Sequence, residues 1–171
     1  MTIFGKTISE YIRFQLPVLI FVAVVGLLRL VLSLAGLPNA TVKWVSVSVA
    51  GLIGVIYYGI RVHTDGFGGF RHLLPLVLIQ NVVTQALIIS AIALAIVTGQ
   101  DNIYTAPEYS VDIRSGASGV EGKTWIHAAG HAVFGLVVGS LMMWAIASLI
   151  LLVTRAVIRG TKPPAPPVEL R

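Results

Sequence analysis

Hydrophobic residues collect in four long runs that are separated by polar segments, and this pattern dominates the sequence. Each run has roughly the 20 residues that an α-helix needs to cross about 30 Å of hydrocarbon. An open strand would leave backbone groups unpaired in lipid, so we expect helices. The predicted transmembrane segments are residues 17–36, 42–60, 73–97 and 125–157.

Composition favours lipid over water as the surroundings of these helices. Of the 171 residues, 56% are hydrophobic and 11% are charged, whereas a soluble domain has about 25% charged residues. So few charges cannot cover a water-facing surface. The sequence therefore predicts an all-α integral membrane four-helix bundle, formed as one domain by residues 1–160, and a Pro-rich disordered tail at residues 161–171.

The positions of Lys and Arg predict the orientation of the bundle. Basic residues collect in the N-terminal segment, in the turn between the second and third runs and in the tail, whereas the loop 98–124 is richer in acidic residues. The positive-inside rule places both termini in the cytoplasm and this loop outside. We expect a bacterial inner (plasma) membrane. The net charge of +5 is explained by these flanks, so nucleic acid is not an expected partner.

A short amphipathic segment precedes the first run. Hydrophobic residues recur there at helical spacing, and Thr7 and Glu10 stand three residues apart as in a capping box. Pro17 is expected to kink the chain or to separate this segment from the first span. The pattern predicts a short N-terminal interfacial helix, built on Phe4, Ile8, Tyr11 and Ile12.

Two histidines form a candidate metal site near the outer end of the fourth run. His127 and His131 are four residues apart, so both side chains share one helix face. Acidic residues of the preceding loop could add oxygen ligands, whereas thiolate sites are excluded because the chain has no cysteine. The alternative is that His127 lies in the membrane interface and His131 hydrogen-bonds within the bundle. The acidic residues are Glu108, Asp112 and Glu121.

Polar residues inside the apolar runs suggest a ligand pocket in the outer half of the bundle. Arg29 is the most costly, since a charge at the centre of a span costs about 2.5–3.5 kcal/mol on insertion scales. Together with Asn81, Gln85 and His131 it could bind a haem, a metal or a quinone. Alternatively, Arg29 extends outward to water, and the third-run amides hydrogen-bond neighbouring helices. The sequence leaves the cofactor open.

The turn between the second and third runs is a candidate site for a phospholipid headgroup. Arg61, Arg71 and His72 flank it, and free amides at the start of the third helix would add donors. The alternative is a tight turn whose Phe67 and Phe70 dip into the membrane interface.

The fourth run contains a GxxxG motif at Gly135 and Gly139. Missing side chains let another helix backbone approach closely, either within the bundle or in a second subunit. Both arrangements fit the sequence. Membrane lipids are expected partners of the apolar runs, and a homo-oligomer or a larger membrane complex is the alternative to packing within one bundle.

Three functions are consistent with these features. The first is a small multi-pass, non-catalytic accessory or scaffold component. The second is a membrane-embedded ligand-binding protein that uses the outer pocket, and the third is an oligomeric passive transporter or channel. Ion-coupled transport is disfavoured because the four runs hold no acidic residue. Catalysis is disfavoured because no paired carboxylates lie in the runs.

Overall fold

The computed structural model describes residues 2–109, 119 and 121–160. The described part contains four helical segments that are long and apolar enough to cross a membrane, which confirms the all-α, four-helix prediction. The predicted tail, residues 161–171, and residues 110–118 and 120 of the loop 98–124 lie outside the described residues. The segments are α1 (Ile8–Leu34), α3 (Val47–Thr64) preceded by the short α2 (Asn39–Val42), α4 (Phe70–Thr98), and a fourth made of α5 (Trp125–Gly130), a π-helical segment (His131–Gly135) and α6 (Leu136–Gly160).

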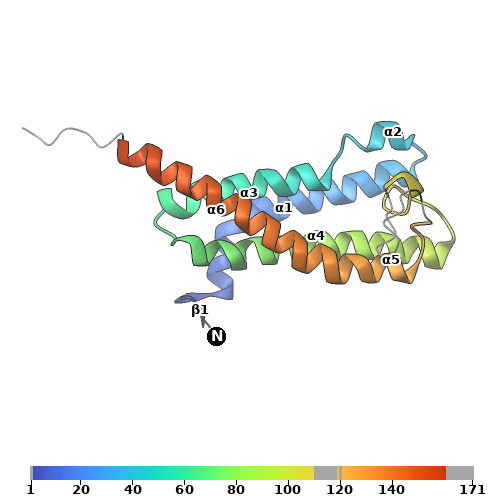
Figure 1. Cartoon of the computed structure of the whole chain (residues 1–171). Helices are drawn as coiled ribbons and strands as arrows, with labels where there is room; N and C mark the ends of the chain where they lie inside the picture. Colours follow the sequence, from blue (N-terminus) through green and yellow to red (C-terminus); the bar gives the residue numbers. More distant parts are fainter. Residues whose placement is uncertain (1, 110–118, 120, 161–171) are drawn as a thin grey trace, which may run out of the picture.

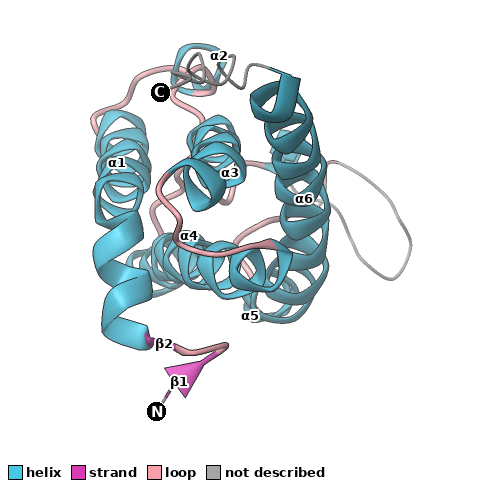
Figure 2. Cartoon of the chain, turned by 90° about the vertical axis from the view of Figure 1, so that its left-hand side faces the viewer, coloured by secondary structure: helices cyan, strands magenta, loops and turns pink. Residues whose placement is uncertain are grey.

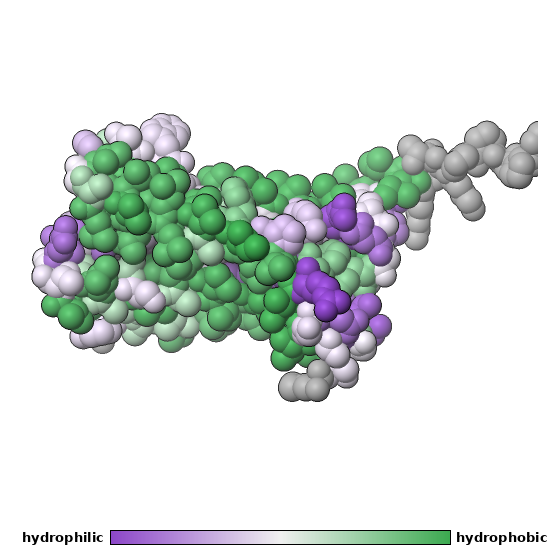
Figure 3. Space-filling model, turned by 180° about the vertical axis from the view of Figure 1, so that it is seen from behind, coloured by the Kyte–Doolittle hydropathy of each residue, from purple (hydrophilic) through white to green (hydrophobic). Residues whose placement is uncertain are grey.

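The helices run side by side along one long axis, with α3 and α4 in the middle (Figures 1 and 2). Both α3 and α4 contact α1 and α6 as well as each other, while α1 and α6 lie on opposite sides of the bundle. A larger share of α3 and α4 than of α1 and α6 is consequently buried. The outer faces stay apolar, since Val24 of α1 is 55% exposed and Leu149 of α6 is 62% exposed. Figure 3 shows this apolar surface as a broad band with polar residues toward the two ends.

The N-terminal segment departs from the predicted interfacial helix. The capping box is present, because Thr7 Oγ1 accepts a bond from the Glu10 amide and Glu10 accepts one from the Thr7 amide. The helix that begins there, however, continues through Pro17 as α1. The described residues before Val18 therefore form no interfacial helix separate from the first span. A proline removes only one backbone donor, and the apolar residues that follow it continue the helix.

Phe4 was wrongly assigned to this helix. Strands β1 (Thr2–Ile3) and β2 (Lys6–Thr7) pair antiparallel. The two residues between them, Phe4 and Gly5, have φ of 52° and 85°. Positive φ at both central residues is the geometry of a tight hairpin turn, which cannot continue a right-handed helix.

The second predicted span begins later than expected. Residues 43–46 interrupt the helix, and α3 starts at Val47, where the Ser46 hydroxyl accepts a bond from the Val49 amide. α4 is longer than predicted, because His72 Nδ1 accepts a bond from the Gly69 amide and caps the helix start. Both differences come from single capping side chains, which helical periodicity does not detect.

A close approach of α3 and α6 depends on Gly59. A Cβ at this position would lie 2.6 Å from Ile150 Cγ2 and 3.0 Å from the Ala147 carbonyl oxygen. We expect Gly59→Ala to lower the free energy of unfolding by about 1–3 kcal/mol, because neither neighbour can rotate away. Thermal unfolding in detergent would measure this loss. The matched control is Gly51→Ala, whose added Cβ would meet only side-chain ends, Gln80 Nε2 at 3.3 Å and Met143 Cε at 3.5 Å, and no backbone atom within that distance. An equal loss there would contradict the explanation.

Candidate functional site

A cavity of about 340 Å³ lies at the end of the bundle that carries α2 and α5. Its volume is at the lower end of the range typical of small-molecule sites. Elements far apart in the sequence meet there, including α1, the start of α3, the loop after α4 and the beginning of the fourth segment. The polar residues of its lining are Arg29, Lys43, Ser46, Ser48, Tyr104, His127 and His131.

Arg29 supplies a charge to this cavity, and no described residue of the lining carries an opposite charge. Its guanidinium lies over the Tyr104 ring, 5.1 Å from the ring centroid. Its Nε atom is buried and has no hydrogen-bond partner among the described residues. No Asp or Glu of the described chain lines the cavity, whereas Lys43 does. The cavity therefore carries positive charge that a negatively charged ligand would neutralise.

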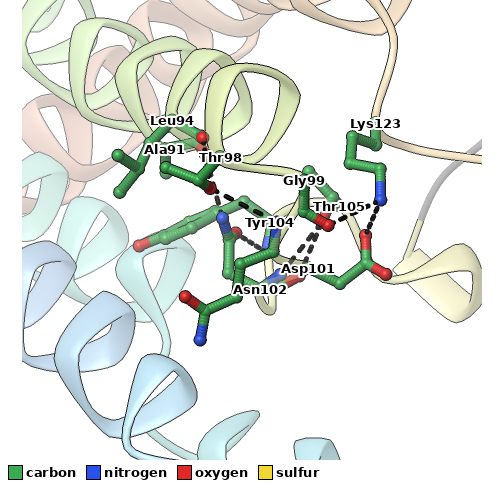
Figure 4. Close-up of polar contacts among 10 residues, drawn as sticks. Ala91, Leu94, Thr98, Gly99, Asp101, Asn102, Tyr104, Thr105 and Lys123 are labelled. Atoms are coloured by element: carbon green, nitrogen blue, oxygen red, sulfur yellow. Dashed lines mark hydrogen bonds and ion pairs between the residues drawn. The ribbon is translucent and has the colours of Figure 1, made fainter.

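The loop that follows α4 brings Tyr104 to Arg29, and Asn102 shapes this loop (Figure 4). Asn102 is buried. Its side-chain Nδ2 donates to the Ala91 carbonyl at 2.9 Å, and its Oδ1 accepts from the Tyr104 backbone amide at 2.9 Å. Lys123 bonds the Gly99 carbonyl and pairs with Asp101, both at 3.1 Å. Asn102 thus fixes the start of the loop to Ala91 of α4, and Lys123 fixes its end to Gly99, directly after α4.

Two further contacts hold the loop against α1. The Tyr104 hydroxyl donates to the Gly26 carbonyl at 3.1 Å, and the Ile103 amide donates to Ser33 Oγ at 2.8 Å. Burial raises the pKa of Tyr104, and the nearby Arg29 charge opposes this only in part. The phenol therefore stays protonated and keeps its donor role at neutral pH.

His131 begins the π-helical segment and reaches the cavity with polar support from α4. Its Nδ1 lies 2.9 Å from Gln85 Oε1, and Gln85 Nε2 donates to Asn81 Oδ1 at 3.1 Å. Asn81 in turn donates to the carbonyls of Gly135 and Leu136 at 2.8 and 3.2 Å. Single π-helical turns are frequent at functional sites. The four residues predicted as one ligand set thus divide: Arg29 and His131 line the cavity, and Asn81 and Gln85 lie behind it.

The GxxxG face packs within the bundle. A Cβ at Gly135 would lie 2.8 Å from Gln85, and one at Gly139 would lie 3.2 Å from Asn81 Nδ2. The missing side chains therefore make room for polar groups of α4. The sequence left open whether the motif contacts a helix of the same chain or of a second subunit. These contacts are with α4 of the same chain.

The predicted metal pair is close, but the described residues add no third ligand. The rings of His127 and His131 pack edge to face with centroids 5.0 Å apart. No group of three or more His, Asp or Glu residues in the described chain could hold a metal ion. Glu108 bonds Asn39 at 2.8 Å, Glu121 is exposed, and Asp112 lies outside the described residues. A metal at the two histidines stays a prediction.

At the opposite end, the structure brings two of the three residues of the predicted headgroup site, Arg71 and His72, to one groove. Arg61 pairs with Asp65 at 2.7 Å. His72 is buried, and its ring nitrogens lie 3.1 Å from the Gly69 amide and 3.2 Å from the Phe4 carbonyl. Arg71 and His72 line this open groove together with Arg155, whose guanidinium stacks on Phe70. Arg155 was missed because its position near the end of the fourth run indicated only topology.

Comparison with protein-family models, with curated proteins and with solved structures found no match to this chain.

The loop contacts generate a test of how Tyr104 is positioned. We expect Asn102→Ala to lower the free energy of unfolding by about 1–3 kcal/mol, because it removes two buried hydrogen bonds. Amide hydrogen exchange should rise over residues 99–109. Thr98→Val is the control, since Thr98 Oγ1 donates to the Leu94 carbonyl and accepts from the Gln100 amide at an exposed helix end. Exchange should rise there only at Gln100. Unchanged exchange in Asn102→Ala would show that the loop does not depend on this side chain.

Proposed function

We propose that this chain is a non-catalytic integral membrane protein that binds an amphipathic anion in the cavity containing Arg29. The proposal places it in a bacterial inner membrane with both termini in the cytoplasm and the cavity at the outer surface. As an accessory component it would act by holding this ligand for a larger membrane complex or an oligomer.

The observation that carries the proposal is the unpaired positive charge of the cavity. Arg29 and Lys43 contribute two cations, and no described carboxylate balances them. Elsewhere in the described chain, Lys6, Arg61 and Lys123 each pair with an acidic side chain, whereas Arg155 at the opposite end resembles Arg29 in having a buried Nε without a partner. Leaving Arg29 without such a partner is costly in an apolar bundle unless a ligand anion completes the site. The same charge disfavours a metal cation.

The surroundings of the cavity support a ligand with an apolar part. Lys43 lies over the ring of Trp44, and Trp44 is 81% exposed, a pairing typical of residues at the membrane interface. Beyond this level the outer faces of α1 and α3 are apolar. A ligand with its anionic group in the cavity could therefore keep its hydrocarbon part in the lipid.

The orientation is supported by the position of the chain ends. β1 and the end of α6 lie at one end of the bundle, and α2 and α5 lie at the other (Figure 1). The cavity lining includes Lys43, directly after α2, and His127 of α5. The positive-inside rule assigns the first end to the cytoplasm. The ligand would consequently enter from the outer leaflet.

The proposal predicts that Arg29 selects for negative charge. The full chain in a neutral detergent should bind dihexanoyl phosphatidylmethanol more tightly than zwitterionic dihexanoyl phosphatidylcholine. Arg29→Gln should weaken binding of the anionic lipid by roughly ten- to hundredfold, as expected for a hydrogen bond to a charged group. Native mass spectrometry measures both affinities on the intact protein.

The control for this experiment is Arg13→Gln, an exposed arginine on the same helix that does not line the cavity. It should leave the affinity within about twofold of the unchanged protein. If both variants weaken binding equally, the attraction is diffuse and the cavity is not the site.

A further inference from the structure

The orientation of the Asn81 amide is fixed by its contacts. Its Nδ2 lies 2.8 and 3.2 Å from the carbonyl oxygens of Gly135 and Leu136, and 2.9 Å from Ser140 Oγ. Backbone carbonyls only accept hydrogen bonds, so the atom facing them must be the NH₂ group. The reverse orientation would press an amide oxygen against two other oxygens. Asn81 Oδ1 is therefore left as an acceptor.

The same reasoning extends through Gln85 to His131. Gln85 Nε2 lies 3.1 Å from Asn81 Oδ1 and must donate to it. Gln85 Oε1 is then an acceptor, and it lies 2.9 Å from His131 Nδ1. His131 Nδ1 therefore carries a proton. In the neutral imidazole Nε2 then keeps the lone pair.

The ring edge that carries Nε2 faces the cavity. His131 lines the cavity, whereas Gln85, its partner at Nδ1, does not. Nε2 has no hydrogen-bond partner among the described residues, and it is not one of their buried, unpartnered atoms. It is thus an accessible acceptor in a cavity whose charged groups, Arg29 and Lys43, are donors.

We infer that the ligand of this cavity carries a hydrogen-bond donor beside its negative charge, and that His131 Nε2 accepts this bond. The inference rests on the proposed anion-binding function and names its ligand class: a phosphodiester with a hydroxylated headgroup. The phosphate contacts Arg29, and a headgroup hydroxyl donates to His131. A membrane lipid and a soluble polyol phosphodiester share this chemistry.

Two lipids with the same charge separate the hydroxyl from the phosphate. Dihexanoyl phosphatidylglycerol and dihexanoyl phosphatidylmethanol are both monoanions at pH 7, and only the first has headgroup hydroxyls. We expect the full chain to bind phosphatidylglycerol about three- to tenfold more tightly, the contribution of one hydrogen bond. In His131→Phe this ratio should fall to about one. His63→Phe, a substitution outside the cavity lining, should keep the ratio.

The outcomes distinguish the inference from the proposed function. Equal binding of the two lipids, with both affinities dependent on Arg29, overturns the inference and leaves the anion site intact. Binding of neither lipid overturns both. Glycerophosphoglycerol, which lacks acyl chains, separates the sources: affinity equal to that of the lipid assigns the hydroxylated anion to a soluble ligand, and weaker binding assigns it to the membrane.

The tautomer of His131 can be measured on the unchanged protein, so this test does not depend on whether a His131 variant folds. Nitrogen NMR of the chain labelled with ¹⁵N-histidine distinguishes a protonated from a bare ring nitrogen. We expect His131 to show a protonated Nδ1 and a bare Nε2 at pH 7, with the Nε2 resonance shifting when phosphatidylglycerol is added. A protonated Nε2 with a bare Nδ1 overturns the inference.

Discussion

The structure depends on one constraint: a polar group inside an apolar bundle must find its partner within the protein. Asn81 shows how the constraint is met. Its amide bonds two carbonyls at the end of the π-helical segment and the Ser140 hydroxyl. It thereby joins α4 to the fourth segment, and Gly135 and Gly139 leave the space that this approach needs. The small residues and the polar side chains are thus two parts of one helix contact.

The cavity is one of the places where the described residues do not meet this constraint by themselves; Gln15, Gln80, Ser148 and Arg155 each also have a buried side-chain atom without a partner there. Arg29 stacks on Tyr104 but has no carboxylate partner among the described residues, and His131 Nε2 has no donor there. Behind them, Gln85 and Asn102 have both side-chain polar atoms bonded. The side chains that hold Tyr104 and His131 in place therefore have their hydrogen bonds already, while the residues that line the cavity have polar atoms without partners. Such preorganisation lowers the conformational entropy that a site loses when it binds a ligand.

The sequence was sufficient for the parts of this fold that repeat along the chain. Four apolar runs predict four helices, because hydrophobicity over roughly 20 residues is a strong signal. It was insufficient where one residue decides the outcome. The positive φ of Phe4, the helix start at Ser46 and the continuation of α1 through Pro17 each depend on local geometry that periodicity averages away.

The candidate site was predictable in its charges but not in its geometry. Arg29 and His131 attract notice because polar groups are costly in apolar runs, and both do line one cavity. Lys43 and Tyr104 give no such signal, since one lies in a short connection and the other in a long loop. Their placement follows from hydrogen bonds between distant segments, such as Tyr104 to Gly26. Helix periodicity places Asn81 and Gln85 on the same face, but only the structure shows that Gln85 bonds His131, that Asn81 bonds Gln85, and that neither lines the cavity.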